Sequence, residues 1–326
     1  MNLSFQRVPK LLESSIQRIV ENPAVVLIYH RVAHLESDPQ LLNVSPEHFE
    51  AQVKWLKKNT HLLTVEEFTH IKLNGDKFPK RSTLITFDDG YFDNCQFARP
   101  ILESYQAQGL FYITTQWLNT HHELWWDELE RLFLIIGLKL KPNALDHLPQ
   151  ANDAPQWTGD SMKDYEHCHR WIKWKQPEDR DTIIGHLRFI ANVDESGRES
   201  HRMMNWGELA VMAQSKSVVL GAHTHQHAPL STLNPQRQRD DILESKKILE
   251  AFTKRQIIHF SYPFGGEKDF NQHSVLIAEQ LGFRLVCANY PGVVFRHTSN
   301  YEIPRMLVRN WELGEFSQQI NQFFRF

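Results

Sequence analysis

The chain has 326 residues, enough for two average domains or for one elaborated barrel. Hydrophobic residues make up 41% of it and charged residues 23%, which excludes a disordered chain, a collagen and a coiled coil as overall descriptions. Thirty-six Lys and Arg against 39 Asp and Glu leave a net charge of −3. The chain therefore lacks the positive field of a nucleic-acid-binding protein, and we expect no nucleic acid as a partner.

Three widely spaced cysteines, Cys95, Cys168 and Cys287, do not form the dense framework of a disulfide-stapled domain, which favours a reducing compartment. The first twenty residues carry scattered charges and lack the apolar core of a signal peptide. No apolar run approaches the roughly 18 to 20 residues of a spanning helix. We therefore expect a cytoplasmic protein with no transmembrane segment. Residues 1–23 are expected to hold an amphipathic helix that packs on the domain or, less favoured, makes weak contact with a membrane surface.

Short β-branched and aromatic runs alternate with helical patterns along the chain. Buried strands are predicted at residues 24–30, 82–87, 109–115, 217–223, 256–262 and 284–289. Helices are predicted at residues 46–59, 94–108, 236–254 and 271–281. This alternation predicts an α/β fold with a mainly parallel sheet, open or barrel-like.

The regular pattern is interrupted between residues 121 and 206, where a helical stretch is followed by a polar segment with several prolines. We expect a mainly helical insertion there. The barrel would then consist of residues 24–120 and 207–310, with a C-terminal helix at residues 311–326.

Two adjacent carboxylates, Asp88 and Asp89, follow the predicted strand 82–87 and precede Gly90. Active sites of parallel α/β folds gather at the carboxyl ends of the strands. Successive residues that leave a strand point to different sides, so one carboxylate can bind a cation while its neighbour moves a proton. An ordinary turn also favours Asp and Gly, so this segment alone does not decide between the two interpretations.

Three histidines, His223, His225 and His227, follow the predicted strand 217–223. The spacing of four residues lets His223 and His227 reach one cation, and Asp89 would complete a set of two imidazoles and a carboxylate. Three protein ligands leave a position open for water and substrate, as in catalytic zinc sites. We expect His225 to point elsewhere.

Two other strand ends fall on the same predicted edge. His30 follows the first strand, and residues 260–265 (FSYPFG) end another strand with an aromatic and proline turn, which alone is ordinary turn chemistry. Within the stretch WWDEL, Trp125 and Trp126 offer faces on which sugar rings can stack, although we favour a buried helix position for Trp126. The convergence of four strand ends predicts a functional site there.

The segments TFDDG at 86–90, HTHQH at 223–227 and FSYPFG at 260–265 together resemble the polysaccharide deacetylases, whose catalytic unit is the NodB homology domain. VVLIYHRV at 25–32 and YEIPRMLV at 301–308 are similar to the branch of that family concerned with bacterial surface glycans. The resemblance covers roughly residues 24–310. It implies a distorted (β/α) barrel that holds a divalent metal, usually zinc, and removes the acetyl group from an N-acetylated sugar.

The resemblance also implies roles for single residues. Asp88 matches the general base, and Asp89, His223 and His227 match the metal ligands. The third motif of the family often carries an arginine that holds the catalytic aspartate, but Ser261 stands at that position here, so the orienting role has no evident residue.

The sequence offers two candidates for the general acid. The late Leu-x-His motif that supplies the acid in many members is not evident in this sequence. In relatives with the YH segment the early histidine is the acid, which makes His30 the candidate and His297 the alternative.

Substrate contacts are expected from Tyr91, whose neighbouring backbone N–H groups would stabilise an oxyanion, and from Trp125, Tyr262, Pro263 and Phe264. The leading hypothesis is a metal-dependent N-deacetylase that acts on a glycan or a lipid-linked or nucleotide-linked precursor. Two alternatives remain: a catalytically inactive glycan-binding protein on the same scaffold, and a non-haem Fe(II) oxygenase, whose facial triad uses the same ligand types.

Overall fold

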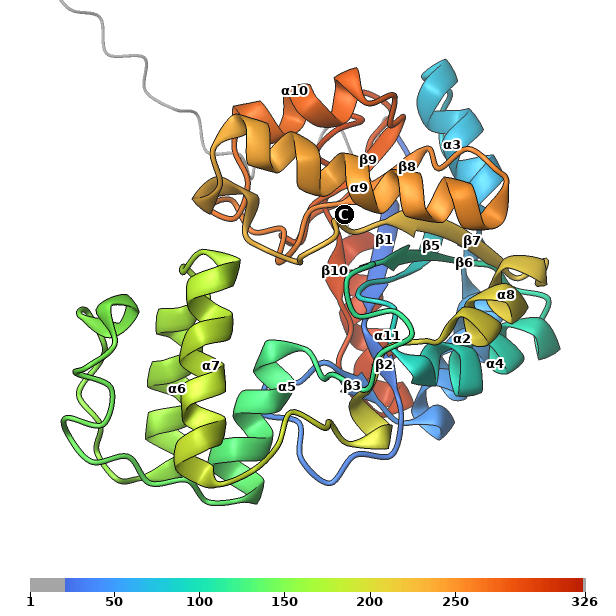
Figure 1. Ribbon diagram of the computed structural model, residues 1–326. Coiled ribbons are helices and arrows are strands. Elements are labelled where there is room, and N and C mark those ends of the chain that lie inside the picture. The colour runs from blue at the N-terminus through green and yellow to red at the C-terminus, as the bar shows by residue number, and fades with distance from the viewer. Residues whose placement is uncertain (1–20, 325–326) are drawn as a thin grey trace, which may run out of the picture.

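A curved sheet of eight parallel strands forms the centre of the computed structural model, which describes residues 21–324 (Figure 1). The strands follow the order β10-β1-β5-β6-β7-β8-β9, and β4 pairs with β5 outside this path. Their bounds are β1 Ala24–Tyr29, β4 His61–Leu62, β5 Ser82–Phe87, β6 Gly109–Ile113, β7 Val218–Ala222, β8 His259–Ser261, β9 Leu285–Cys287 and β10 Met306–Leu307. A separate two-stranded sheet joins β2 (Arg31–Val32) to β3 (Asn43–Val44).

The long central strands are buried on both faces, as expected for a parallel sheet that helices cover. On one face Phe87 and Phe111 stack with ring centroids 4.4 Å apart and continue the core toward Tyr29 and Phe49. On the other face Leu84 and the rest of a smaller apolar cluster pack beneath α3. The runs that predicted these strands are mostly apolar because neither face meets water, and the polar residues of β5, Ser82, Thr83 and Thr86, are buried as well.

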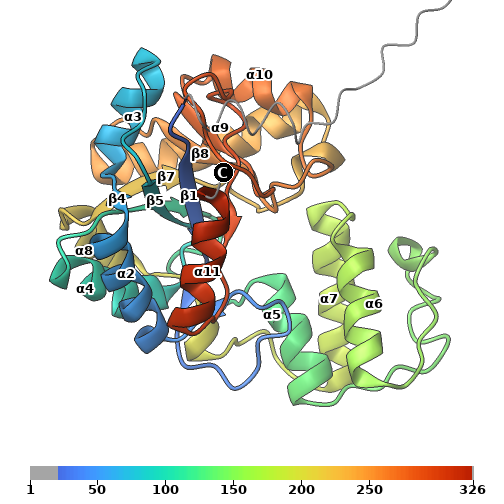
Figure 2. The ribbon, with the colours of Figure 1, turned by 180° about the vertical axis from the view of Figure 1, so that it is seen from behind.

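Helices surround the sheet in both views (Figures 1 and 2). They are α2 Pro46–Asn59, α3 Val65–Asn74, α4 Arg99–Ser104, α8 Trp206–Gln214, α9 Pro235–Thr253, α10 Gln272–Gln280 and α11 Leu313–Phe324. Side-chain caps fix several of their starts: Ser45 accepts from the His48 N–H, and Thr64 forms a capping box with Glu67. α11 lies within the stretch predicted as a C-terminal helix.

The sheet curls into a half-barrel whose end strands are β10 and β9. A single-residue parallel bridge links Cys287 at the end of β9 to Ile303, three residues before β10. The architecture confirms the expected distorted barrel of the NodB type. Three predicted elements were clearly too long: the strands predicted at 256–262 and 284–289 span only residues 259–261 and 285–287, and the helix predicted at 94–108 ends at Ser104.

The stretch predicted as an insertion holds three helices, α5 (Trp125–Glu130), α6 (Ser161–Ile172) and α7 (Pro177–Ala191). The pair α6 and α7 stands beside the barrel, with α5 between the pair and the sheet, in both Figure 1 and Figure 2. These helices share an apolar cluster of their own, which includes Trp125, Leu129, Tyr165 and Ile183.

Two further expectations concern the chain outside the barrel. The amphipathic helix predicted within residues 1–23 falls largely outside the described residues. Among residues 21–324, no helix combines the length and apolar character needed to cross a bilayer. Cys95, Cys168 and Cys287 are buried and carry free thiols.

Candidate active site

The register of the parallel strands brings the four predicted strand ends to one edge. Tyr29 of β1 pairs with Phe87 of β5, so the residues that follow them, His30 and Asp88, emerge side by side. In the same way Ala222 of β7 pairs with Phe260 of β8. A cavity of about 350 Å³ opens at this edge, and the predicted residues that line it are His30, Asp88, Asp89, His223, His227 and Phe264.

Three of these side chains form a compact donor set. The Asp89 Oδ1 atom lies 3.1 Å from the His227 Nε2 atom and 3.4 Å from the His223 Nε2 atom, and the two Nε2 atoms are 3.2 Å apart. The Nδ1–H of His223 donates to the carbonyl of Ser261 at 2.8 Å, which leaves the Nε2 lone pair of His223 directed at the same point. All three residues are buried, and their ligand atoms lie within 4.8 Å of one another.

The backbone around the donor set adopts a rarely used conformation. Asp89, Thr224 and His227 have φ angles of 76°, 63° and 49°, in the left-handed region that non-glycine residues seldom occupy. The Thr224 hydroxyl accepts from the His227 N–H at 3.0 Å, and the Asp89 carbonyl accepts from the Thr114 N–H at 3.0 Å. Such conformations persist where surrounding contacts impose them, and they are concentrated at functional sites.

The protonation of Asp89 and His227 suits a cation, whereas for His223 burial lowers the pKa but the carboxylates of Asp88 and Asp89 outweigh it and raise that pKa. Burial raises the pKa of Asp89, but hydrogen bonds with His223 and His227 outweigh it and hold the pKa far below its usual range. Burial lowers the pKa of His227, which favours the neutral imidazole that binds metals. Converging lone pairs of two imidazoles and a carboxylate repel one another unless a cation lies between them. The residues therefore fit a divalent metal ion of the kind that catalytic sites with three protein ligands hold.

A buried arginine holds Asp88. The Arg305 Nη1 and Nη2 atoms donate to the two carboxylate oxygens of Asp88 at 2.7 Å each, and Nη2 also donates to the Ser261 hydroxyl at 2.7 Å. The Arg305 Nε–H donates to the Ala288 carbonyl, which fixes the guanidinium plane. Burial raises the pKa of Asp88, yet Arg305, His223 and His30 together more than offset it and lower that pKa, so the carboxylate stays ionised.

Sequence reasoning missed Arg305. The family pattern places the orienting residue at position 261, which is a serine here. The Ser261 hydroxyl donates to Asp88 at 3.2 Å and accepts from Arg305. The segment YEIPRMLV could have revealed Arg305, because it is part of the resemblance and places this arginine directly before the hydrophobic pair Met306 and Leu307. That pair is β10, whose parallel pairing with β1 carries Arg305 beneath the carboxyl end of β5.

The two candidates for the general acid lie at opposite edges of the sheet. His30 lines the cavity, and burial lowers its pKa although the two neighbouring carboxylates raise it. His297 follows Val294, which pairs with Ala24 at the amino end of β1, and it forms an ion pair with Glu21. The structure thus brings His30, and not His297, to the cavity.

His225 points away from the donor set, as expected. Its Nδ1 atom lies 2.9 Å from the Thr115 hydroxyl, on the other side of the loop.

Four of the predicted substrate-binding residues do not line the cavity. The Tyr91 hydroxyl is buried and donates to Asp127 at 2.6 Å, and Tyr262 stacks on Phe270 with centroids 4.1 Å apart. Pro263 is buried, and Trp125 faces a neighbouring cavity. Of the five predicted residues, Phe264 is the one that reaches the cavity, where its ring meets His227 edge-on at 4.8 Å.

Other side chains that sequence reasoning did not single out complete the cavity wall. Trp126, favoured above as a core residue, packs its ring 4.9 Å from His227. His169 and Lys173 of the α6 region also line the cavity, and Lys173 forms an ion pair with Asp269 at 2.7 Å. The helices of the insertion therefore supply one wall of the site. The spacing of Trp126, His169 and Lys173 along the sequence gives no sign that they meet there.

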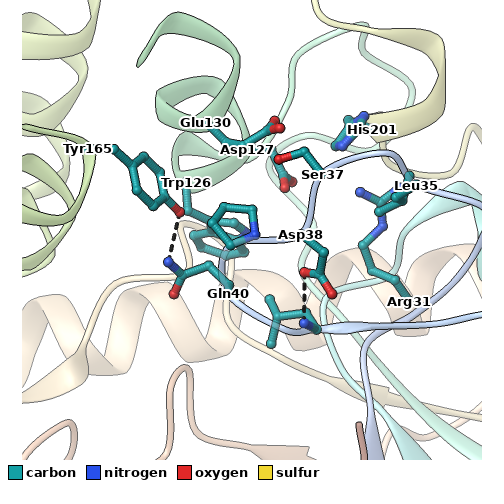
Figure 3. Close-up of a pocket in the computed structure, with 12 residues that line it drawn as sticks. Arg31, Leu35, Ser37, Asp38, Gln40, Trp126, Asp127, Glu130, Tyr165 and His201 are labelled. Carbon is teal, nitrogen blue, oxygen red and sulfur yellow. Dashed lines mark hydrogen bonds between the residues drawn. The ribbon is translucent and has the colours of Figure 1, made fainter. Parts of the chain in front are cut away.

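A smaller pocket adjoins this wall and shares Gln40, Leu42 and Trp126 with the cavity. Figure 3 shows Asp127 and Glu130 of α5 at this pocket, and Asp38, from the segment after β2, with its carboxylate accepting from the Leu42 N–H at 2.9 Å. Burial raises the pKa of Asp127 to about 7. The pocket is too narrow for a sugar ring, so the 350 Å³ cavity is the candidate site.

Comparisons with known proteins point to one family. The model of the family described as polysaccharide deacetylase matches residues 75–149 and 189–286, more than half of the chain. The unmatched stretch 150–188 holds α6 and most of α7. Among solved structures, IcaB from Ammonifex degensii superimposes with a TM-score of 0.60 at 17% identity, covering 93% of this chain and 98% of that one.

Two curated relatives differ in how much of them this chain covers. YxkH of Bacillus subtilis, named as a polysaccharide deacetylase, is 24% identical over 291 residues, which is 88% of this chain and 73% of that protein. The poly-beta-1,6-N-acetyl-D-glucosamine N-deacetylase of Staphylococcus aureus is 39% identical over 108 residues. That match spans 29% of this chain and 37% of the staphylococcal protein.

Proposed function

This chain belongs to the polysaccharide deacetylase family and is a carbohydrate deacetylase by class, and we propose that it removes the N-acetyl group from an acetamido sugar in a glycan or glycan precursor. The observation that carries the proposal is the ionised Asp88, clamped by Arg305 beside three converging metal-type donors. A base next to a cation site is what hydrolysis of an amide requires.

We propose that Asp89, His223 and His227 hold a divalent metal, with zinc as the first candidate. Such an ion acts as a Lewis acid and lowers the pKa of water. The donors come from two separate strand ends, so the folded barrel presents them as a preformed set.

The chain's own side chains then handle the protons. Asp88 accepts a proton from the water that attacks the acetamide carbonyl, and Arg305 keeps its carboxylate in place throughout. His30 donates a proton to the departing amine nitrogen, because an amide nitrogen leaves poorly unless it is protonated. Acetate and a free amino sugar are the products.

The environment of Asp88 argues against both the inactive scaffold and the Fe(II) oxygenase. The inactive-scaffold hypothesis was suggested by Ser261 in place of an arginine and by the absent late Leu-x-His motif. Arg305 fills the orienting role from β10, and His30 lines the cavity as the candidate acid. An Fe(II) oxygenase needs no second carboxylate beside its triad, whereas Asp88 lies 3.7 Å from the His223 Nε2 atom and is held ionised.

The substrate is proposed by class. Polymeric β-1,6-linked N-acetylglucosamine is one candidate, by analogy with the staphylococcal relative, and a lipid-linked or nucleotide-linked precursor is another. The cytoplasmic location stays a prediction.

An acetate-release assay tests the proposal. Purified protein is incubated with N-acetylglucosamine oligomers, nucleotide-linked sugars and lipid-linked sugars, with and without a chelator. We expect acetate from at least one class, its loss with the chelator, and its return on adding a divalent metal. Oxygen consumption dependent on Fe(II), or no acetate from any class with metal-loaded protein, would reject the proposal.

A further inference from the structure

A second cavity, of about 400 Å³, lies on the other side of α5 from the candidate active site. One wall comes from the loop after β6, another from α5 and a third from α7. The lining residues used below are Gln116, Trp117, Trp125, Glu128, Asp181 and Arg188. Its volume falls within the range of ordinary small-molecule sites.

Two buried polar atoms of this cavity's lining residues have no hydrogen-bond partner among the described residues. One is the indole Nε1–H of Trp125, a residue that is 3% exposed, and the other is the side-chain oxygen of Gln116. A buried donor or acceptor left unpaired typically costs about 1 to 3 kcal/mol, so native proteins rarely retain one without a purpose. A hydroxyl or amide group can pair with a donor or an acceptor of this kind.

Among the charged side chains of the cavity, Glu128 and Arg188 hold each other, whereas the exposed Glu195 stands without an ion-pair partner among the described residues. Glu128 is held by Arg188 at 3.0 Å and by Arg131 at 3.3 Å. Burial raises the pKa of Asp181, and the Arg180 guanidinium lies 3.9 Å from it. The two unpaired buried atoms belong to neutral groups, and the half-buried indole of Trp117 adds an apolar plane. Aromatic planes beside neutral hydrogen-bonding groups suit the faces and hydroxyls of a pyranose ring.

The cavity shares its dividing wall with the active site. Trp125 packs against Trp126 and Phe264, with ring centroids 5.3 Å and 6.2 Å away, and both of those residues line the catalytic cavity. The Gln116 N–H donates to the carbonyl of His225, in the loop between the two histidine ligands.

We propose that this second cavity binds a neutral pyranose unit of the same glycan whose acetamido group is cleaved in the first. The inference rests on the proposed function for the identity of the glycan. The α7 side of the cavity belongs to the stretch that the family model does not match. The enzyme would then favour oligosaccharides long enough to occupy both cavities.

Equilibrium binding to the Asp88→Asn protein tests the inference without turnover. Oligomers of N-acetylglucosamine with one to six units, both β-1,4- and β-1,6-linked, are titrated by calorimetry. We expect affinity to rise with length, and we expect Trp117→Ala and Gln116→Ala each to weaken binding of the long oligomers about tenfold while leaving the monosaccharide unaffected. Gln116→Ala provides the answer if the Trp117 variant fails to fold.

Trp174→Ala is the matched control, because this tryptophan lies next to α6 and is 44% exposed, outside the cavity. Long oligomers that bind both cavity variants as tightly as the parent would overturn the inference, as would equal weakening by the control or no binding of any oligomer. Cavity-dependent binding without acetate release by metal-loaded wild type would reject the proposed function and keep the subsite. Acetate release by metal-loaded wild type, together with unchanged oligomer binding by both cavity variants, would keep the proposed function and reject the subsite.

Discussion

The pairing of Arg305 with Asp88 gives the sharpest prediction about stability and activity together. Both side chains are at most 4% exposed, so solvent does not screen their contact. Replacing Arg305 by Met removes two charge-assisted hydrogen bonds of 2.7 Å and leaves a carboxylate buried without its counter-charge. Breaking one side of such a pair typically costs about 3 to 5 kcal/mol, so we expect Arg305→Met to lower the free energy of unfolding by about 3 kcal/mol or more.

The free energy of unfolding lost in Arg305→Met should depend on pH in a defined direction. Arg305 holds the folded-state pKa of Asp88 below the unfolded value near 3.8, so the stability that it contributes is present above that pH and is lost as the pH falls. Urea denaturation should therefore show the largest difference between wild type and Arg305→Met at neutral pH and a smaller one toward pH 3. Acetate release should fall as well, because burial alone raises the pKa of the base.

A double-mutant cycle with Asp88→Asn separates the pair from general damage to the core. Asp88→Asn and Arg305→Met should couple by about 2 kcal/mol or more, since each removes the partner of the other. Arg296→Met is the control, because its ion pair with Glu21 is exposed. Additive effects in the cycle, or an Arg305→Met protein within about 0.5 kcal/mol of wild type, would refute the assignment of Arg305 as the residue that holds the base.

Three further substitutions probe other parts of the site. His227→Ala removes one of three donors, so elemental analysis should find the metal lost, and one retained ion per chain would contradict the ligand set. His30→Ala should lower kcat for acetate release by about 100- to 10,000-fold with metal content unchanged, whereas a wild-type rate would move the acid elsewhere. Asp127→Asn removes a carboxyl whose pKa burial raises to about 7, so the stabilising protonated form is fully present below about pH 4 and is lost as the pH rises through 7. Relative to wild type, the Asp127→Asn variant should gain Tm between pH 5 and pH 8, and parallel Tm curves would disprove this.

The strand ends were predictable because a parallel sheet has a simple geometry. A buried strand is an unbroken apolar run, and the residue at its carboxyl end must join its neighbours at one edge. That rule alone brought His30, Asp88, His223 and Phe264 to the same cavity.

Arg305 was not predictable in the same way. It lies 217 residues from Asp88, and the strand that positions it has two residues, too few to show a hydrophobic period. Charge complementarity between a buried arginine and a buried aspartate becomes visible only when the pairing of β10 with β1 is known.

The two tryptophans illustrate a second limit. Trp125 and Trp126 are neighbours on one helix, so their side chains point about 100° apart. Trp126 consequently lines the catalytic cavity and Trp125 the second one. Which of the two faces the catalytic site depends on how α5 docks on the barrel, and the sequence does not encode that rotation in any local pattern.

The central claim is that Asp88 moves the proton for a hydrolysis at the Asp89, His223 and His227 set. Acetate release from an N-acetylated oligosaccharide, measured for wild type and Asp88→Asn at equal metal content, tests it most directly. We predict that the variant keeps its metal and loses turnover. A variant that releases acetate at the wild-type rate, or that loses its metal together with its activity, would contradict the division of roles between the two carboxylates.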